Sequence, residues 1–126
     1  MILVDTSSLV HLLRRKGNPA IKERVRAILR SGDAAICPMI EVELWMGSSS
    51  DKDARDVQEL SELLISLPAT EAVWKEAARL ARGCRELGKP VPSSDVVIAA
   101  TAFVHGATID TEDRHFEILG ALPRGS

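Results

Sequence analysis

Four acidic residues stand at the borders of apolar segments, where a soluble fold rarely places carboxylates. They are Asp5 after the run 1–4, Glu43 within 40–45, Asp95 before 96–100, and Asp113 after 107–112. Carboxylates are seldom buried unless they are paired or bound to a metal. Carboxylates brought together from separate segments form a site for a hard cation. The four residues therefore predict a metal-dependent reaction, with a phosphodiester as the first substrate class to consider.

The apolar pattern predicts the elements that must position these acids. Short buried strands are expected over 1–4, 34–37 and 107–109, and 67–68 is either a brief strand or a connector. Helical spacing of apolar residues predicts a first helix from Asp5 to near Gly17, followed by helices over 19–30, 39–46, 51–66, 70–88, 95–105 and 112–119. Strands separated by helices indicate an α/β sandwich with a mostly parallel sheet.

The predicted sheet would bring the acids to one edge. In open α/β sheets, sites form beyond the carboxyl ends of the strands. Asp5 ends the first strand, and Asp110 and Asp113 follow the strand over 107–109. If the helices pack on the sheet, Asp95 at a helix start and Glu43 within a helix can join them. Because several carboxylates repel one another, such a cluster calls for a cation such as Mg²⁺ or Mn²⁺.

Each acid also has an ordinary structural explanation. Asp5, followed by Thr and Ser, could be a helix N-cap, and Asp95 could favour the helix dipole. Glu43 could be a solvated helix residue, and Asp113 could belong to an acidic turn. One arrangement accounts for all four positions together, so we prefer the metal site.

The composition restricts the class of protein. The 126 residues include 16 basic and 18 acidic side chains, with a net charge of −2, so no general nucleic-acid-binding surface is expected; an acidic cleft with a basic rim remains open. Aromatic residues make up 3%, which argues against a base-stacking sheet.

Cys37 and Cys84 are interpreted as two buried thiols in a reducing compartment, and we expect a cytoplasmic protein without a signal peptide or membrane span. We expect one domain over 1–122 and an exposed tail over 123–126.

Four segments, in order, carry a resemblance to a known family. They are Val4-Asp5-Thr6-Ser7, Glu43-Leu44 with Gly47, the run 94–102, and Thr111-Glu112-Asp113-Arg114-His115-Phe116. This set resembles the signature segments of PIN-domain ribonucleases, in particular VapC toxins of toxin–antitoxin pairs, and it covers nearly the whole chain. The resemblance implies a three-layer α/β/α sandwich and a Mg²⁺- or Mn²⁺-dependent endoribonuclease. It also implies a homodimer, and inhibition by a cognate VapB-like antitoxin whose C-terminal segment enters the acidic groove, in a heterotetramer or larger assembly.

The resemblance also implies roles for individual residues. The catalytic and metal-binding quartet would be Asp5, Glu43, Asp95 and Asp113. The hydroxyl groups that support these carboxylates would be those of Thr6, Ser7 and Thr111, and Ser94 could act in the same way. Asp110 stands where an apolar or neutral residue is expected, so it either increases metal affinity or points to solvent.

Basic, histidine and large apolar residues offer further candidates for a binding surface. The candidate RNA contacts are Arg14, Arg15, Arg82 and Arg114, although a solvated helix face explains such residues equally simply. The three histidines, His11, His105 and His115, lack ligand spacing and are predicted to lie on helix surfaces or ends, without a zinc site. Trp45 and Met46 belong either to the core or to a groove for an antitoxin side chain, and Trp74 to the core or a dimer contact.

Other function classes fit the sequence less well than a ribonuclease does. A catalytically silent PIN-like module that binds a partner protein or RNA is the alternative, although the retention of all four acids argues against it. A phosphatase of the haloacid-dehalogenase type needs a second Asp two residues after the first, and Ser7 stands there. No Walker-type phosphate loop is present either.

Overall fold

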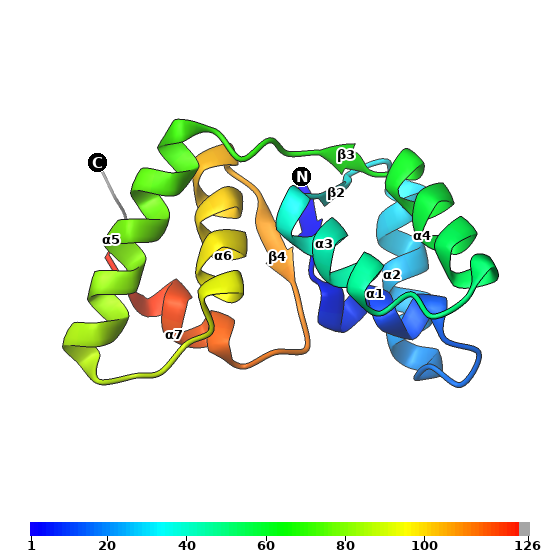
Figure 1. Ribbon diagram of the computed structural model, residues 1–126, viewed down its shortest axis with the longest axis horizontal. Helices are drawn as coiled ribbons and strands as arrows, with labels where there is room; N and C mark the ends of the chain where they lie inside the picture. The colour runs from blue at the N-terminus through cyan, green and yellow to red at the C-terminus, as the bar shows by residue number, and fades with distance from the viewer. Residues whose placement is uncertain (124–126) are drawn as a thin grey trace.

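A parallel four-stranded sheet lies at the centre of the computed structural model, which describes residues 1–123 (Figure 1). The strands are β1 (Ile2–Val4), β2 (Ala34–Ile36), β3 (Ile65–Ser66) and β4 (Thr108–Asp110), in the order β3-β2-β1-β4. All three pairings are parallel, and Leu3 lies between Ala35 and Ile109. The mostly parallel sheet expected from the sequence is confirmed.

Seven helices surround this sheet in the described part of the chain. They are α1 (Thr6–Leu13), α2 (Pro19–Ser31), α3 (Pro38–Met46), α4 (Asp51–Leu63), α5 (Glu71–Leu87), α6 (Ser93–His105) and α7 (His115–Ala121). Figure 1 shows α5, α6 and α7 on one side of β4, and α1, α2 and α4 on the other side. Helices therefore cover the sheet from both sides, which confirms the α/β/α sandwich.

Three predicted boundaries were wrong by three or more residues. Helix α1 ends at Leu13 rather than near Gly17, because Arg14 takes an extended conformation. Helix α4 ends at Leu63, because Leu64 takes an extended conformation and Ile65 pairs with Ala35. Residues 67–68 are therefore the connector, the second of the two alternatives considered, and the brief strand lies just before them. Helix α7 begins at His115 rather than at residue 112, because the preceding residues make hydrogen bonds to side chains instead of helical ones. No strand follows α7 within residues 1–123, and Leu122 is buried there.

The core consists of aliphatic side chains packed around β1, β2 and α6. Leu3, Val4 and the strand β2 are buried, as short apolar runs in a parallel sheet should be. Helix α6 is buried over much of its circumference through small residues such as Ala99 and Ala100, which permit close packing against α5. Both cysteines are free and buried. None of the helices in residues 1–123 has the length and apolarity required to cross a bilayer.

This architecture brings three element ends to one edge of the molecule. Because β1 and β4 are parallel neighbours, their carboxyl ends lie side by side, and the Asp5 amide donates to the Asp110 carbonyl at 2.9 Å. Helix α6 runs in the opposite direction to β4, so its first turn lies near the end of that strand (Figure 1). The residues that follow β1 and β4 and those that begin α6 therefore face one another.

Candidate metal centre

Asp5 joins the end of β1 to the start of α1. Its side chain is buried, and its Oδ2 atom accepts from Ser7 Oγ at 2.7 Å and from Thr111 Oγ1 at 2.9 Å. The Ser7 amide donates more weakly to the same oxygen, so Asp5 is also the N-cap of α1. All hydrogen bonds found for this carboxylate within residues 1–123 involve Oδ2. Oδ1 therefore has no hydrogen-bond donor in this part of the chain.

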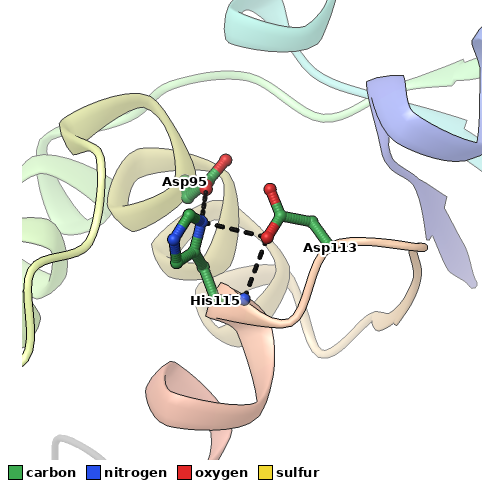
Figure 2. A group of neighbouring side chains, drawn as sticks. All are labelled: Asp95, Asp113 and His115. Atoms are coloured by element: carbon green, nitrogen blue, oxygen red, sulfur yellow. Dashed lines mark hydrogen bonds and ion pairs between the residues drawn. The ribbon is translucent and has the colours of Figure 1, made fainter.

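Asp95 and Asp113 meet around the imidazole of His115. His115 Nδ1 lies 3.0 Å from Asp95 Oδ2 and 2.9 Å from Asp113 Oδ1 (Figure 2). The His115 amide also donates to Asp113 Oδ1 at 2.9 Å. One ligand atom from each of these residues lies within 4.8 Å of the others, so the three residues together could hold a metal ion.

Burial and mutual repulsion raise the pKa of two of the acids. Burial raises the pKa of Asp95 to about 6, the charges of Asp113 and Asp5 act in the same direction, and the hydrogen bond from His115 opposes them. Burial also raises the pKa of Glu43, with further contributions from Asp5 and Asp113 and an opposing hydrogen bond from Thr6. Asp95 and Glu43 therefore both lie close enough to Asp5 and Asp113 for the charges of those two acids to act on them. The structure brings all four predicted acids into one electrostatic cluster.

Glu43 reaches this cluster from α3. The Thr6 hydroxyl donates to Glu43 Oε1 at 2.8 Å and ties α3 to the start of α1. Helix α3 begins at Pro38, directly after β2, because proline suits the first turn of a helix. Glu43 is half-buried, so the solvated helix position considered from the sequence does not describe it.

Asp110 has a different environment. Its Oδ1 atom accepts from Ser8 Oγ at 2.7 Å and from Arg24 Nη2 at 3.1 Å, and its Oδ2 atom accepts from Arg24 Nε at 2.9 Å. The side chain is 15% exposed. Asp110 is therefore not a solvent-facing residue, and both of its oxygens are occupied by protein donors. Arg24 was not identified from the sequence.

Comparisons with known proteins identify the family of the chain. Residues 2–122 match the model of the PIN domain family. The chain belongs to the PIN-domain family. Ribonuclease VapC11 of Mycobacterium tuberculosis is 35% identical over 126 residues, which cover 97% of this chain and 93% of VapC11.

Solved structures share the fold of this PIN domain. FitAcB from Neisseria gonorrhoeae has a TM-score of 0.80 and 27% identity, and the match covers 95% of this chain and 94% of that one. A toxin–antitoxin complex from Klebsiella pneumoniae has a TM-score of 0.77 at 17% identity, over 98% of this chain and 93% of that chain. At that identity the likeness shows a common fold.

Of the four predicted hydroxyl groups, three contact a carboxylate of the cluster and one does not. Thr6, Ser7 and Thr111 all bond directly to a carboxylate of the cluster, as described above for Asp5 and Glu43. Ser94 lies in the first turn of α6, but its hydroxyl makes no side-chain hydrogen bond among the described residues. His115 was predicted to be a helix-end histidine; it begins α7, yet it also contacts two acids of the cluster. The sequence signal was its place two residues after Asp113, which does not reveal its contact with α6.

The four predicted arginines lie in different surroundings. Arg14 lines a depression of about 220 Å³ together with Glu43, and Arg15 lines an adjoining depression that also contains Arg14. Arg114 lines a third depression together with Asp113 and Thr111. Arg82 lies on α5, pairs with Glu86 at 3.3 Å, and lines a depression that includes none of the four acids. The structure thus brings Arg14 and Arg114, but not Arg82, beside the cluster.

Three large apolar side chains lie on the surface of the PIN domain. Trp45 is 43% exposed and Met46 is 82% exposed, so neither is a core residue. Both belong to the last turn of α3, close in sequence to Glu43. Trp74 on α5 is 51% exposed, so the core position considered for it is wrong.

Proposed function

We propose that this PIN domain is a divalent-metal-dependent endoribonuclease that hydrolyses RNA phosphodiester bonds, acting as the toxin of a toxin–antitoxin pair. The observation that carries the proposal is the meeting of four carboxylates from four separate segments, two of which have a raised pKa because of burial and the charges of the others. The 35% identity to a protein named as a ribonuclease supports the same reaction class.

The donor atoms of the cluster fit Mg²⁺ or Mn²⁺. Asp5, Glu43, Asp95 and Asp113 offer carboxylate oxygens, the ligands that both ions prefer. His115 Nδ1 adds a nitrogen donor, which suits Mn²⁺ better than Mg²⁺. A divalent cation would also offset the burial and the repulsion that together raise the pKa of Asp95 and of Glu43. When bound, such a cation supplies Lewis acidity, which favours ionisation of water and stabilises negative charge on the phosphate.

The remaining residues of the site hold and orient these ligands. Ser7 and Thr111 fix Asp5 through Oδ2, and Thr6 fixes Glu43. Without the cation, His115 holds Asp95 and Asp113 close together through its Nδ1 atom, the same atom that would turn to a bound metal. Arg14 and Arg114 line depressions beside Glu43 and Asp113, where their charges would contact RNA phosphates on either side of the scissile bond.

A cognate antitoxin is the proposed protein partner. The exposed Trp45 and Met46, at the end of the helix that carries Glu43, offer an apolar surface beside the acids. Trp and Met are favoured at protein interfaces, and a VapB-like segment that covers this surface would also block the site. The family resemblance supports a homodimer of a single domain over 1–122, in the cytoplasm, where an RNA substrate is available. Of the proposed tail over 123–126, residues 124–126 lie outside the described residues.

Substitution of two ligands tests the proposed function. We expect Asp5→Asn and Asp95→Asn each to lower Mn²⁺-dependent cleavage of total RNA by at least about 100-fold, because each loses a charged ligand. Circular dichroism should show an intact fold for both variants. Asp51→Asn, an exposed acid in the first turn of α4, is the matched control and should cleave like the wild type. Undiminished cleavage by both site variants would reject the assignment.

The same preparation distinguishes the catalytically silent binding module. An enzyme should bind Mn²⁺ in a calorimetric titration and cleave RNA in its presence. If the wild-type chain neither binds Mn²⁺ at millimolar concentration nor cleaves RNA, the binding module becomes the better description.

A further inference from the structure

We propose that Arg24, on α2, is a positioning residue that holds the turn over residues 110–113 in the geometry required for metal binding. The inference rests on the proposed function, because it concerns the same metal site. Within residues 1–123, Arg24 makes no hydrogen bond or ion pair with the four acids of the cluster. It contacts the turn that carries Asp113.

Arg24 contacts this turn at two residues, Asp110 and Glu112. Its guanidinium group donates to both oxygens of Asp110, from Nε at 2.9 Å and from Nη2 at 3.1 Å. The Nη2 atom also donates to Glu112 Oε1 at 2.6 Å. The fully buried Ser8 on α1 donates to Asp110 Oδ1 at 2.7 Å, so the carboxylate is held by two helices at once. Such a bidentate arrangement fixes direction as well as distance.

The opposite side of the same turn contacts the metal cluster. Thr111 Oγ1 donates to Asp5 Oδ2 at 2.9 Å and accepts from the Asp113 amide at 2.9 Å. The Glu112 amide donates to Ser7 Oγ at 3.0 Å. Arg24 thus holds residues 110 and 112. The intervening Thr111 donates to Asp5, and the following Asp113 offers a metal ligand. Movement of Asp110 and Glu112 would shift both at once.

The charge of Arg24 makes a positioning role distinguishable from an electrostatic one. If Arg24 acted only through its charge, its removal would leave Asp110 and Glu112 without their cation and would strengthen Mn²⁺ binding. If it positions the turn, its removal weakens Mn²⁺ binding instead. Lysine carries the same charge but lacks the planar fork, so Arg24→Lys should restore part of the affinity at most.

Calorimetric titration of Mn²⁺ into matched variants tests the inference. We expect Arg24→Gln to weaken Mn²⁺ binding by about 10- to 100-fold, the range typical of residues that orient metal ligands. The control is Arg30→Gln: Arg30 lies on the same helix and pairs with Glu23 at 2.7 Å on its surface, so this variant should bind like the wild type. Unchanged or tighter binding by Arg24→Gln would overturn the inference.

Amide hydrogen exchange in metal-free protein gives a second readout, which does not depend on the proposed function. Arg24→Gln should speed the exchange of the Glu112 and Asp113 amides by at least about tenfold while leaving the amides of β2 unchanged, because the turn opens locally. Arg30→Gln should change neither set. If the wild type binds no Mn²⁺, the proposed function fails. In either case, unchanged exchange at Glu112 and Asp113 in Arg24→Gln rejects the positioning role of Arg24.

Discussion

Asp5 and Asp95 each satisfy a local and a long-range requirement with the same carboxylate. Asp5 caps α1 through Oδ2. The same oxygen accepts a hydrogen bond from the hydroxyl group of Thr111, which follows β4. Asp95 stands in the first turn of α6, where a negative charge is favoured, yet it is buried against the charge of Asp113. The helix-start explanation of both residues was therefore right, and it does not exclude a site. Without a cation, the charged form of Asp95 is disfavoured at this position, as its raised pKa indicates.

The raised pKa of Asp95 predicts how its removal affects stability. A carboxyl group whose pKa is higher in the folded state favours folding most below its ordinary pKa, and this contribution is lost as the pH rises to about 6. The neutral variant Asp95→Asn should therefore stabilise metal-free protein at pH 8 by about 1 to 3 kcal/mol, with a smaller gain at pH 5. Urea unfolding at the two pH values, with EDTA present, measures both gains. Equal effects at pH 5 and pH 8 would contradict the assigned pKa.

At the scale of elements, helix ends and strand ends determine where the side chains point. Helix α2 begins with Asn18 and Pro19; the Asn18 side chain accepts from the Ala20 amide at 2.9 Å and from the Ile21 amide at 3.1 Å. This cap starts the helix that presents Arg24 to the 110–113 turn. The late start of α7 has the same origin, because the Asp113 amide bonds to the Thr111 side chain.

The cap of α2 gives a prediction at this scale. Asn18→Ala should lower the free energy of unfolding by about 1 kcal/mol, because two amides at the helix start lose their acceptor. Asn18→Asp keeps an acceptor at the same position and should retain most of the stability. Urea unfolding of the two variants beside the wild type makes the comparison. Equal destabilisation by both substitutions would show that the cap is not the cause.

At the scale of the whole molecule, the acid cluster lies between depressions with arginine side chains. Arg14 and Glu43 share one depression, and Arg114 and Asp113 share another. The overall charge of −2 therefore does not describe the surface that RNA would meet. Acids in one cleft with basic residues at its borders can bind an anion without a basic protein.

This distribution predicts which arginines matter for substrate binding. Arg14→Gln should weaken binding of single-stranded RNA and lower the slope of log K against log salt by about 0.7, as expected for one lost phosphate contact. Arg82→Gln is the control, because Arg82 pairs with Glu86 away from the acids and should change neither quantity. Fluorescence anisotropy with Ca²⁺ in place of Mn²⁺ would measure binding without cleavage. An equal loss in both variants would argue for a diffuse electrostatic effect.

The sequence by itself determined the features that depend on neighbouring residues. Apolar runs and helical spacing located most strands and helices, and capping residues located helix starts such as Asp5 and Pro19. The order of the four acidic segments indicated the PIN-domain family, since the acids follow β1, lie in α3, begin α6 and follow β4.

Tertiary structure alone decided the contacts between distant residues. His115 meets Asp95 across 20 positions of sequence, and Arg24 meets Asp110 across 86. Neither spacing has a local signature, because such pairs form only when α2, α6 and α7 are packed against the sheet. The apolar character of Trp45 and Trp74 likewise could not show whether they are buried or exposed. Burial depends on which helix face the rest of the molecule covers.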